Sequence, residues 1–241
     1  MPIRVYLTID DAPSQEFPLK LRLLEQHNIP AVWFCQGNHI ATYPKSVIDA
    51  IKKGYVIGNH SYSHPSFADI SIEQGFAEIS STDDIITKLY EHIGIERNHR
   101  YFRFPYGNKG DSQHDHDTSK SQKRDILQNY LRGQGYSAPP FQHVGFPKQF
   151  ANHVDWYWTF DTNDWMPFFP ELRSEEFKTP ELVIASVHKW LIRNSSEQAI
   201  EVKPHIILMH DLSGQIAYQL FKDLVEVMLL HDVVFCDVND L

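Results

Sequence analysis

Two histidines four positions apart are the residues best suited to chemistry in this sequence. His60 and His64 stand in residues 58–65, directly after the apolar run 55–57. If the chain makes a single helical turn there, both rings leave on one side. Neutral imidazoles at that spacing suit a divalent metal, with zinc first. Because the chain has 14 histidines, two surface or capping histidines stay an alternative.

Two adjacent acids form a second candidate cluster. Residues 5–9 are typical of a buried strand, and this run ends in Asp10 and Asp11, with Pro13 following. A turn or a helix cap is the alternative, since Asp before Pro favours turns. In the functional interpretation, one carboxylate binds the metal and the other moves protons. One Asp and two His leave a coordination position for water, which is the arrangement of a catalytic zinc site.

The elements that must position these residues follow a βα pattern. Short apolar runs alternate with helix-like segments, which indicates an α/β fold with a parallel sheet. The pattern predicts strands over residues 5–9, 31–35, 55–57, 100–104, 154–160, 205–209 and 233–236. It predicts helices over residues 17–27, 44–53, 71–92, 126–132, 180–193 and 215–230.

Polar residues gather where the predicted strands end. In a parallel barrel the carboxyl ends of the strands meet on one face, which is where active sites lie. Five separate clusters at five strand ends therefore indicate one site rather than five unrelated caps. These clusters are Asp10 with Asp11, His60 with His64, Arg103, Asp164, and His210.

Composition limits the classes of function. With 241 residues and 42% hydrophobic residues, the chain can form one large domain, which we expect to span residues 1–241. The formal net charge of -9 argues against a nucleic-acid partner or an anionic membrane. Residues 1–4 lead straight into the first strand without a signal peptide or a membrane span, so we expect a cytoplasmic protein unless the chain is trimmed. The oligomeric state is left open.

Two further features bear on chemistry. Cys35 and Cys236, the only cysteines, each end a strand-like run; we interpret both as small buried residues without a disulfide framework. Residues 108–153 form a variable region. Its histidines His114 and His116 could bind a metal, but the polar surroundings favour a solvated loop.

Five motifs, in order, resemble those of the polysaccharide deacetylase family, also called carbohydrate esterase family 4 or the NodB-homology domain. They cover residues 5–13, residues 30–65, Arg103 to Gly107, Asp164 with Trp165, and residues 208–211. Ile9 and Ala12 stand where the family usually has Phe and Gly, and neither change removes a functional group. The resemblance implies a distorted (β/α) barrel of about seven parallel strands.

The resemblance also implies roles for the metal and the general base. Asp11, His60 and His64 would hold one divalent ion, with zinc first and cobalt or nickel as alternatives. The ion would lower the pKa of its bound water to about 7. Asp10 would be the general base, held ionised by Arg103. A salt bridge at the rim is the alternative role for Arg103.

The remaining implied roles concern the acid and the pocket. His210 would protonate the leaving amine, and Asp164 would orient its ring. The Tyr106 backbone N–H would stabilise the oxyanion. Trp165 and Leu208 would wall a pocket for the acyl methyl, with plain core packing as the alternative for both.

The function implied is a metal-dependent hydrolase that removes an N-acyl group, acetyl first, from an N-acetylated amino sugar, oligosaccharide or polysaccharide. One alternative keeps the fold and the metal but cuts a non-sugar C–N bond or a formamide of a small intracellular metabolite. A second is a non-catalytic sugar-binding module, which predicts a lost ligand, base or acid. A Ser or Cys nucleophile finds no support, because no Gly-x-Ser-x-Gly motif is present.

Overall fold

The computed structural model describes residues 2–110, 122–138, 144, 152–172, 174–195 and 203–240. Within these ranges six strands form one sheet in the order β3-β2-β1-β5-β4, and β6 pairs with the start of β1. All pairs are parallel, which confirms the predicted α/β class. The strands are β1 (Arg4–Ala12), β2 (Ala31–Cys35), β3 (Val56–Asn59), β4 (Phe160–Asp161), β5 (His205–His210) and β6 (Val234–Phe235).

Between β3 and β5 the barrel is continued by two irregular segments, one around Phe102 and one around Trp156. Phe102 forms an isolated parallel bridge with Asn59. The Trp156 N–H donates to the Phe102 carbonyl at 2.7 Å, and the Thr159 N–H donates to the Ile206 carbonyl at 2.9 Å. These bonds give the distorted barrel that the resemblance implied.

Two predicted strands are much shorter than expected. The segment 100–104 contributes only the Phe102 bridge, and the segment 154–160 becomes a strand only at β4. Both segments bury bulky side chains, Arg103 and Trp156 among them, and share scattered backbone hydrogen bonds with their neighbours instead of a regular ladder. Apolar runs indicate burial, and burial alone does not require regular pairing.

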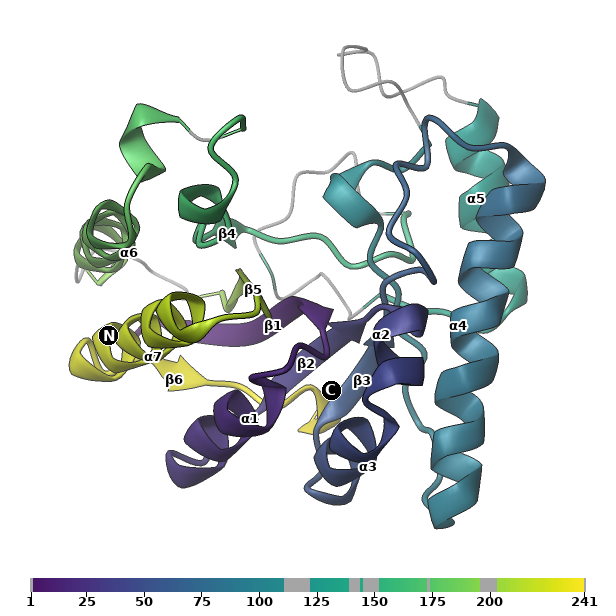
Figure 1. The fold of residues 1–241 in the computed structure, drawn as a ribbon, viewed down its shortest axis with the longest axis horizontal. Helices are drawn as coiled ribbons and strands as arrows, with labels where there is room; N and C mark the ends of the chain where they lie inside the picture. Colours follow the sequence, from purple (N-terminus) through teal and green to yellow (C-terminus); the bar gives the residue numbers. More distant parts are fainter. Residues whose placement is uncertain are drawn as a thin grey trace.

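Helices cover the outside of the sheet (Figure 1). Contacts between successive pairs give the order α6, α7, α1, α3, α4, α5 around the barrel. The helices are α1 (Phe17–Gln26), α2 (Gly37–Thr42), α3 (Pro44–Lys52), α4 (Ile72–Ile93), α5 (Gln122–Gly133), α6 (Pro180–Asn194) and α7 (Gln215–Leu230). All but the short α2 were predicted, and α2 lacks the repeated apolar spacing that marks a longer helix.

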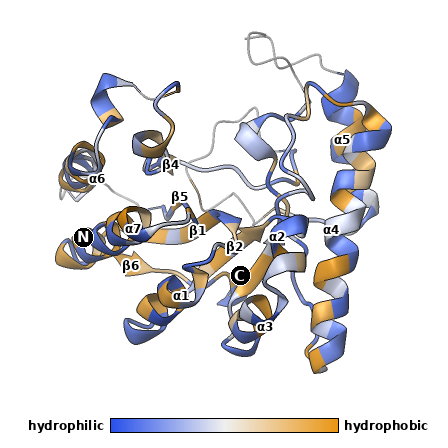
Figure 2. Ribbon diagram, viewed as in Figure 1, coloured by the Kyte–Doolittle hydropathy of each residue, from blue (hydrophilic) through white to orange (hydrophobic). Residues whose placement is uncertain are grey.

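Side chains of β1 alternate between two cores. Val5, Leu7 and Ile9 pack outward against the helices in the larger hydrophobic cluster. Tyr6 points to the opposite face with Val32, Phe34 and Trp156, inside the barrel. In Figure 2 the strands are largely apolar and the helices alternate between apolar and polar residues. Because side chains alternate along a strand, Thr8 and Asp10 share the inward face with Tyr6.

The ends of α4 explain why this helix could be predicted so closely. Ser71 and Gln74 form a capping box at its start, and Gly94 takes a left-handed conformation (φ 68°) after its end. These are the residues that favour helix termini. Among the described residues, no helix is both long and apolar enough to cross a membrane.

The cysteines differ from each other. Both are free thiols, but Cys35 is buried, as predicted, whereas Cys236 is only partly buried. The expectation that both are core residues is therefore wrong for Cys236, because β6 reaches only Val234 and Phe235 and lies at the margin of the sheet.

Candidate active site

The end of β1 supplies two carboxylates with different directions. Asp10 is buried and lies opposite His210 in the parallel register of β1 and β5. Asp11 has a left-handed backbone (φ 66°) and is partly exposed. A positive φ is costly for a residue other than glycine and persists only where the surroundings fix it. Successive side chains of a regular strand point to opposite faces. The kink at Asp11 changes this, so that the carboxylates of Asp10 and Asp11 both reach the same site.

The segment after β3 delivers the two histidines without the helical turn that we expected. Residues 60–64 form a bent loop in which Ser61 (φ 65°) and His64 (φ 60°) are left-handed. The loop is fixed by local hydrogen bonds: the Ser61 N–H donates to Asn59 Oδ1 at 2.9 Å, and the His64 N–H donates to Ser61 Oγ at 3.1 Å. The prediction of a helical turn is wrong, but its consequence, two rings on one side, is found.

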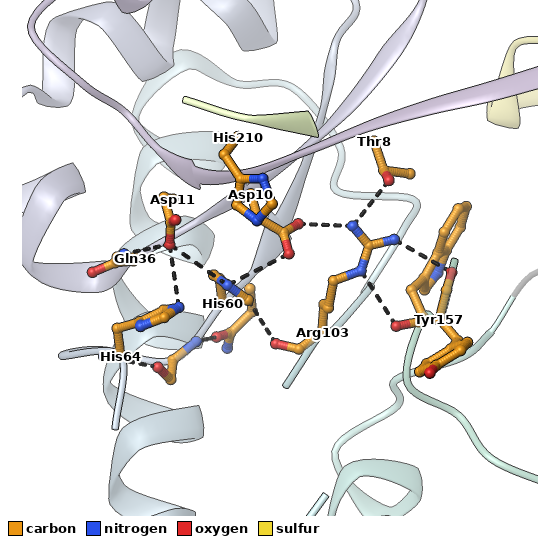
Figure 3. A network of polar contacts seen from close by, with 12 residues as sticks. Thr8, Asp10, Asp11, Gln36, His60, His64, Arg103, Tyr157 and His210 are labelled. Atoms are coloured by element: carbon orange, nitrogen blue, oxygen red, sulfur yellow. Dashed lines mark hydrogen bonds and ion pairs between the residues drawn. The ribbon is translucent and has the colours of Figure 1, made fainter. Parts of the chain in front are cut away.

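Asp11, His60 and His64 meet at one point (Figure 3). Each offers one ligand atom, and these atoms lie within 4.8 Å of one another. Asp11 Oδ1 is 3.2 Å from His64 Nε2 and 3.7 Å from His60 Nε2. Two imidazoles and one carboxylate suit zinc and neighbouring divalent metals, and three protein ligands leave a position open. The donor set therefore fits the metal that the family resemblance implies.

His60 is prepared to act as a neutral ligand. Its Nδ1 lies 2.8 Å from the Arg103 carbonyl, an acceptor, so the ring carries its proton on Nδ1 and presents the Nε2 lone pair to Asp11. Burial, reinforced by the neighbouring His64, lowers the pKa of His60 from 6.5 to about 3. The imidazole is consequently neutral over the physiological range.

Asp11 is held ionised. Burial would raise its pKa, but the nearby His64, His60 and His210 outweigh that effect, so the pKa lies below its ordinary value. Gln36, buried at the end of β2, donates from Nε2 to Asp11 Oδ1 at 2.8 Å. A hydrogen bond of this kind orients a ligating carboxylate.

Asp10 is fixed from inside the barrel. Arg103 Nη1 donates to Asp10 Oδ1 at 2.7 Å and to Thr8 Oγ1 at 2.9 Å. The guanidinium lies over the Phe34 ring, with Cζ 4.4 Å from its centroid. Arg103 is fully buried, which excludes the alternative of a salt bridge at the rim. The other Asp10 oxygen, Oδ2, lies 3.6 Å from His60 Nε2 and so faces the three-ligand cluster.

His210 and Asp164 form a second charged pair, next to Asp10 in the register of β1 and β5. Asp164 Oδ1 is 2.7 Å from His210 Nδ1, and its Oδ2 accepts the His210 N–H at 2.9 Å. Burial would lower the pKa of His210, but the charge and hydrogen bond of Asp164 outweigh it, with Asp11 and Asp161 adding to the effect, and raise the pKa to about 10. The ring is an imidazolium at neutral pH, with Nε2 left to carry a transferable proton.

The three predicted pocket residues surround these groups. Tyr106 is 62% exposed, has a left-handed backbone (φ 58°) and places its ring 4.6 Å from the His64 ring. The Trp165 ring lies 6.5 Å from the His210 ring, edge to face. Leu208 is buried on β5, two positions before His210 and therefore on the same face. All three lie within the same region, and their roles stay predictions.

Two contributors were missed from the sequence. Thr8 stands two positions before Asp10, so strand alternation could have identified it as an inward-facing partner. Gln36 directly follows the buried run of β2, and the rule that polar residues at strand ends build the site applies to it as well. The predicted histidine-rich loop, with His114 and His116, lies outside the described residues, as does half of the region 108–153.

Comparison with known proteins agrees with this geometry. The family model "polysaccharide deacetylase" matches residues 2–125, about half of the chain, and the chain belongs to that family. A peptidoglycan-N-acetylglucosamine deacetylase from Bacillus cereus is 36% identical over 104 residues, which are 43% of this chain and 36% of that protein. A chitooligosaccharide deacetylase from Rhizobium leguminosarum bv. trifolii is 29% identical over 98 residues, 40% of this chain and 46% of that protein. The match thus spans less than half of the length of these curated relatives.

The fold also agrees with solved structures. The peptidoglycan deacetylase PdaC from Bacillus subtilis superimposes with a TM-score of 0.62 over 99% of this chain and 89% of that one, at 20% identity. The expected fold, a parallel α/β barrel of the polysaccharide-deacetylase type, is therefore confirmed.

Proposed function

We propose that this protein is a metal-dependent hydrolase that removes the acetyl group from an N-acetylated amino sugar, free or within an oligosaccharide or polysaccharide. One observation carries the proposal: the Asp11–His60–His64 cluster lies beside the buried carboxylate of Asp10, which binds Arg103, and close to His210, which pairs with Asp164. A metal site flanked by a proton acceptor and a proton donor is suited to hydrolysis of an amide. The curated relatives whose names describe sugar deacetylases support the choice of substrate.

Asp11, His60 and His64 would hold the metal, with zinc first and cobalt or nickel as alternatives. Nitrogen and carboxylate donors in this number suit all three ions, and zinc accepts a tetrahedral set with one position for water. When bound, the ion would polarise the substrate carbonyl and bring the pKa of a bound water to about 7.

Asp10 would take the proton from the attacking water. Arg103 binds one of its oxygens and leaves Oδ2 toward the metal cluster. The buried guanidinium keeps the carboxylate in position and compensates its charge. A general base in such a position contributes roughly 10²–10⁴ in rate.

His210 would donate a proton to the leaving nitrogen. Cleavage of an amide at neutral pH requires that the amine leave protonated, and the raised pKa keeps His210 charged to do this. Asp164 fixes the ring through Nδ1, so the remaining proton is on Nε2. The proton accepted by Asp10 and the proton given by His210 balance over the reaction.

The residues around His210 and around the three metal ligands would define where the substrate lies. The Tyr106 peptide would donate to the oxyanion beside the metal, an interaction worth about 3 kcal/mol. Leu208 and Trp165 would wall the space for the acetyl methyl, which is apolar and small. The exposed Tyr106 ring gives the site an aromatic surface toward solvent, which suits a sugar ring.

The alternative readings of the sequence make different predictions. A non-catalytic sugar-binding module would lack a ligand, base or acid, whereas Asp10, Asp11, His60, His64 and His210 are all in place. Hydrolysis of a non-sugar C–N bond or a formamide would use the same groups and differs only in product. The cytoplasmic location and the absence of nucleic-acid or membrane partners stay predictions.

Mass spectrometry of candidate N-acetyl sugars, before and after incubation with zinc-loaded protein, tests the proposal. We expect loss of one acetyl group and release of acetate, abolished by chelation and by His60→Ala. Formate or ammonia, measured separately in the same panel, would identify the alternative substrates. Full activity after chelation and in His60→Ala would contradict the proposal.

A further inference from the structure

A further buried ion pair lies close to the site, between helix α1 and the end of β5. It joins Lys20 on α1 to Asp211, the residue after β5. Both side chains have no exposed surface. Asp211, the last residue of the fifth motif, is almost completely buried. Sequence reasoning assigned no role to Lys20.

Asp211 contacts the chain on both sides of the ligand Asp11. Its backbone N–H donates to the carbonyl of Asp10 at 2.8 Å. Its carboxylate accepts from the backbone N–H and the Oγ of Ser14, each at 2.6 Å. Asp11 therefore stands in a short segment whose two ends are tied to one residue, and that residue directly follows His210.

Lys20 completes the arrangement by neutralising the carboxylate. Its ammonium binds Asp211 Oδ1 and donates to the Leu212 carbonyl at 2.8 Å. The ammonium also lies 5.4 Å from the centroid of the Phe221 ring. Removing two charges from water is expensive, and a well-packed apolar pair would often be as stable or more stable. Stability alone is thus a weak reason for this pair.

Asp11 needs such support because its backbone is left-handed (φ 66°). A conformation of this kind persists only where contacts on both sides fix it. The Asp10 carbonyl precedes Asp11, and Ser14 follows it by three positions. The contacts of Asp211 meet that requirement, and through the chain they also set the position of β1 relative to His210.

We propose that Asp211, neutralised by Lys20, is a positioning residue that holds the ligand Asp11 and the acid His210 in register. The pair binds Ser14 and the carbonyls of Asp10 and Leu212, so it acts through the backbone of both strand ends. The proposal rests on the proposed function for its catalytic consequence. Its effect on the metal ligand can be measured without any substrate.

The test compares two double variants that lack both charges. Lys20→Met with Asp211→Asn retains a side-chain oxygen that can accept from Ser14, whereas Lys20→Met with Asp211→Leu does not. Zn²⁺ affinity is measured by competition with a chromophoric chelator, and stability by urea unfolding. We expect the Asn variant to bind Zn²⁺ within about threefold of the wild type, and the Leu variant to bind about 10–100-fold more weakly, the range of losses from removing a partner of a metal ligand.

Activity on the substrate identified for the wild type supplies a second readout. We expect kcat of the Leu variant to fall tenfold or more while KM changes less than threefold, because the pair supports Asp11 and His210 rather than the predicted pocket residues Tyr106, Trp165 and Leu208. The matched control is Lys53→Met with Glu25→Leu, which removes an exposed pair that also involves α1; we expect it to change neither Zn²⁺ affinity nor kcat.

Each outcome distinguishes the two proposals. Equal Zn²⁺ affinity in the Asn variant, the Leu variant and the wild type would overturn the positioning role. A loss of Zn²⁺ affinity that is proportional to the loss of stability in urea in every variant, the control included, would overturn it as well. If the Leu variant does not fold, Ser14→Ala replaces it, since this change removes one of the two Ser14 donors and predicts a smaller loss of affinity. A wild type that binds Zn²⁺ but deacetylates no sugar would contradict the proposed function and leave the Zn²⁺ comparison intact.

Discussion

The end of β3 and the end of β5 are each followed or closed by a histidine, His60 fully buried and His210 partly buried, yet the two rings differ in charge. His60 has a pKa lowered to about 3, and His210 has a pKa raised to about 10. Burial lowers the pKa of both. The difference comes from the partner of Nδ1, which is the neutral Arg103 carbonyl for His60 and the Asp164 carboxylate for His210.

This contrast assigns the two halves of the site their chemistry. A neutral imidazole with its proton on Nδ1 offers a lone pair, which is what a metal ligand needs. A charged imidazole offers a proton, which is what a general acid needs. In the proposed mechanism, two residues of one type, both placed by strand ends, would thus serve different steps because their partners differ.

The largest effect that we expect comes from His60→Ala. The variant lacks one of three ligands, so Zn²⁺ affinity should fall by more than about 100-fold, beyond the loss typical of an outer-shell partner. Deacetylation should fall to background. Competition with a chelator and acetate release measure the two quantities, and retention of both in the variant would mean that His60 is not a ligand.

The matching substitution at the end of β5 is His210→Ala. We expect kcat to fall about 10²–10⁴-fold, the usual contribution of an acid or base, while Zn²⁺ affinity stays within about threefold. A large loss of Zn²⁺ affinity here would show that the two histidines do not have separate roles.

Asp164→Asn tests the origin of the raised pKa. The folded-state pKa of His210 lies above its ordinary value, so the charged form is favoured by folding. That contribution to stability is fully present below about pH 6.5, the ordinary value, and is lost as the pH rises through about 10. At pH 6 the variant should have a lower free energy of unfolding than the wild type. Above pH 10 this difference in the free energy of unfolding should be smaller.

The same variant should change the pH dependence of activity. In the wild type, kcat/KM should decline on the alkaline side only as His210 loses its proton. In Asp164→Asn this decline should move toward neutral pH, with activity at pH 6 affected least. A pH profile that keeps its alkaline limb in the variant would show that Asp164 does not set the pKa of His210.

The smallest effect that we expect is that of Trp165→Ala. The ring lies edge to face with His210 at 6.5 Å but carries no charge. Loss of an aromatic contact worth about 0.5–1.5 kcal/mol should raise KM about two- to tenfold. The alkaline limb of the kcat/KM profile should stay at the pH found for the wild type, because Asp164 still binds His210 Nδ1. A shift of that limb would show that Trp165 also influences the pKa of His210.

The sequence predicted the order of elements and the main groups of the site, because these depend on periodic burial and on strand ends. Six helices and the parallel sheet follow from apolar spacing, and Ser71 and Gly94 mark the ends of α4. The convergence of Asp11, His60 and His64 follows from the common direction of parallel strands. The resemblance to the deacetylase family supplied the roles.

Other features depended on contacts that sequence patterns do not record. The left-handed Ser61 and His64 replace the expected helical turn. Local bonds from Asn59 and Ser61 fix this loop together with long-range bonds to Glu78 on α4 and to the Gly37 N–H. Lys20 and Asp211 are charged residues, which are expected at the surface. Each can be buried only because the other neutralises its charge, and the sequence does not record that pairing. The segments around Phe102 and Trp156 are as apolar as strands but pair irregularly.

The protonation states of His60 and His210 are the central claim, and nitrogen NMR of the metal-free protein labelled at histidine measures them directly. At pH 8 we predict that His60 is neutral with its proton on Nδ1 and that His210 is protonated on both nitrogens. Variants His60→Ala and His210→Ala assign the two signals. A neutral His210 at pH 8, or a His60 that carries its proton on Nε2, would contradict the account.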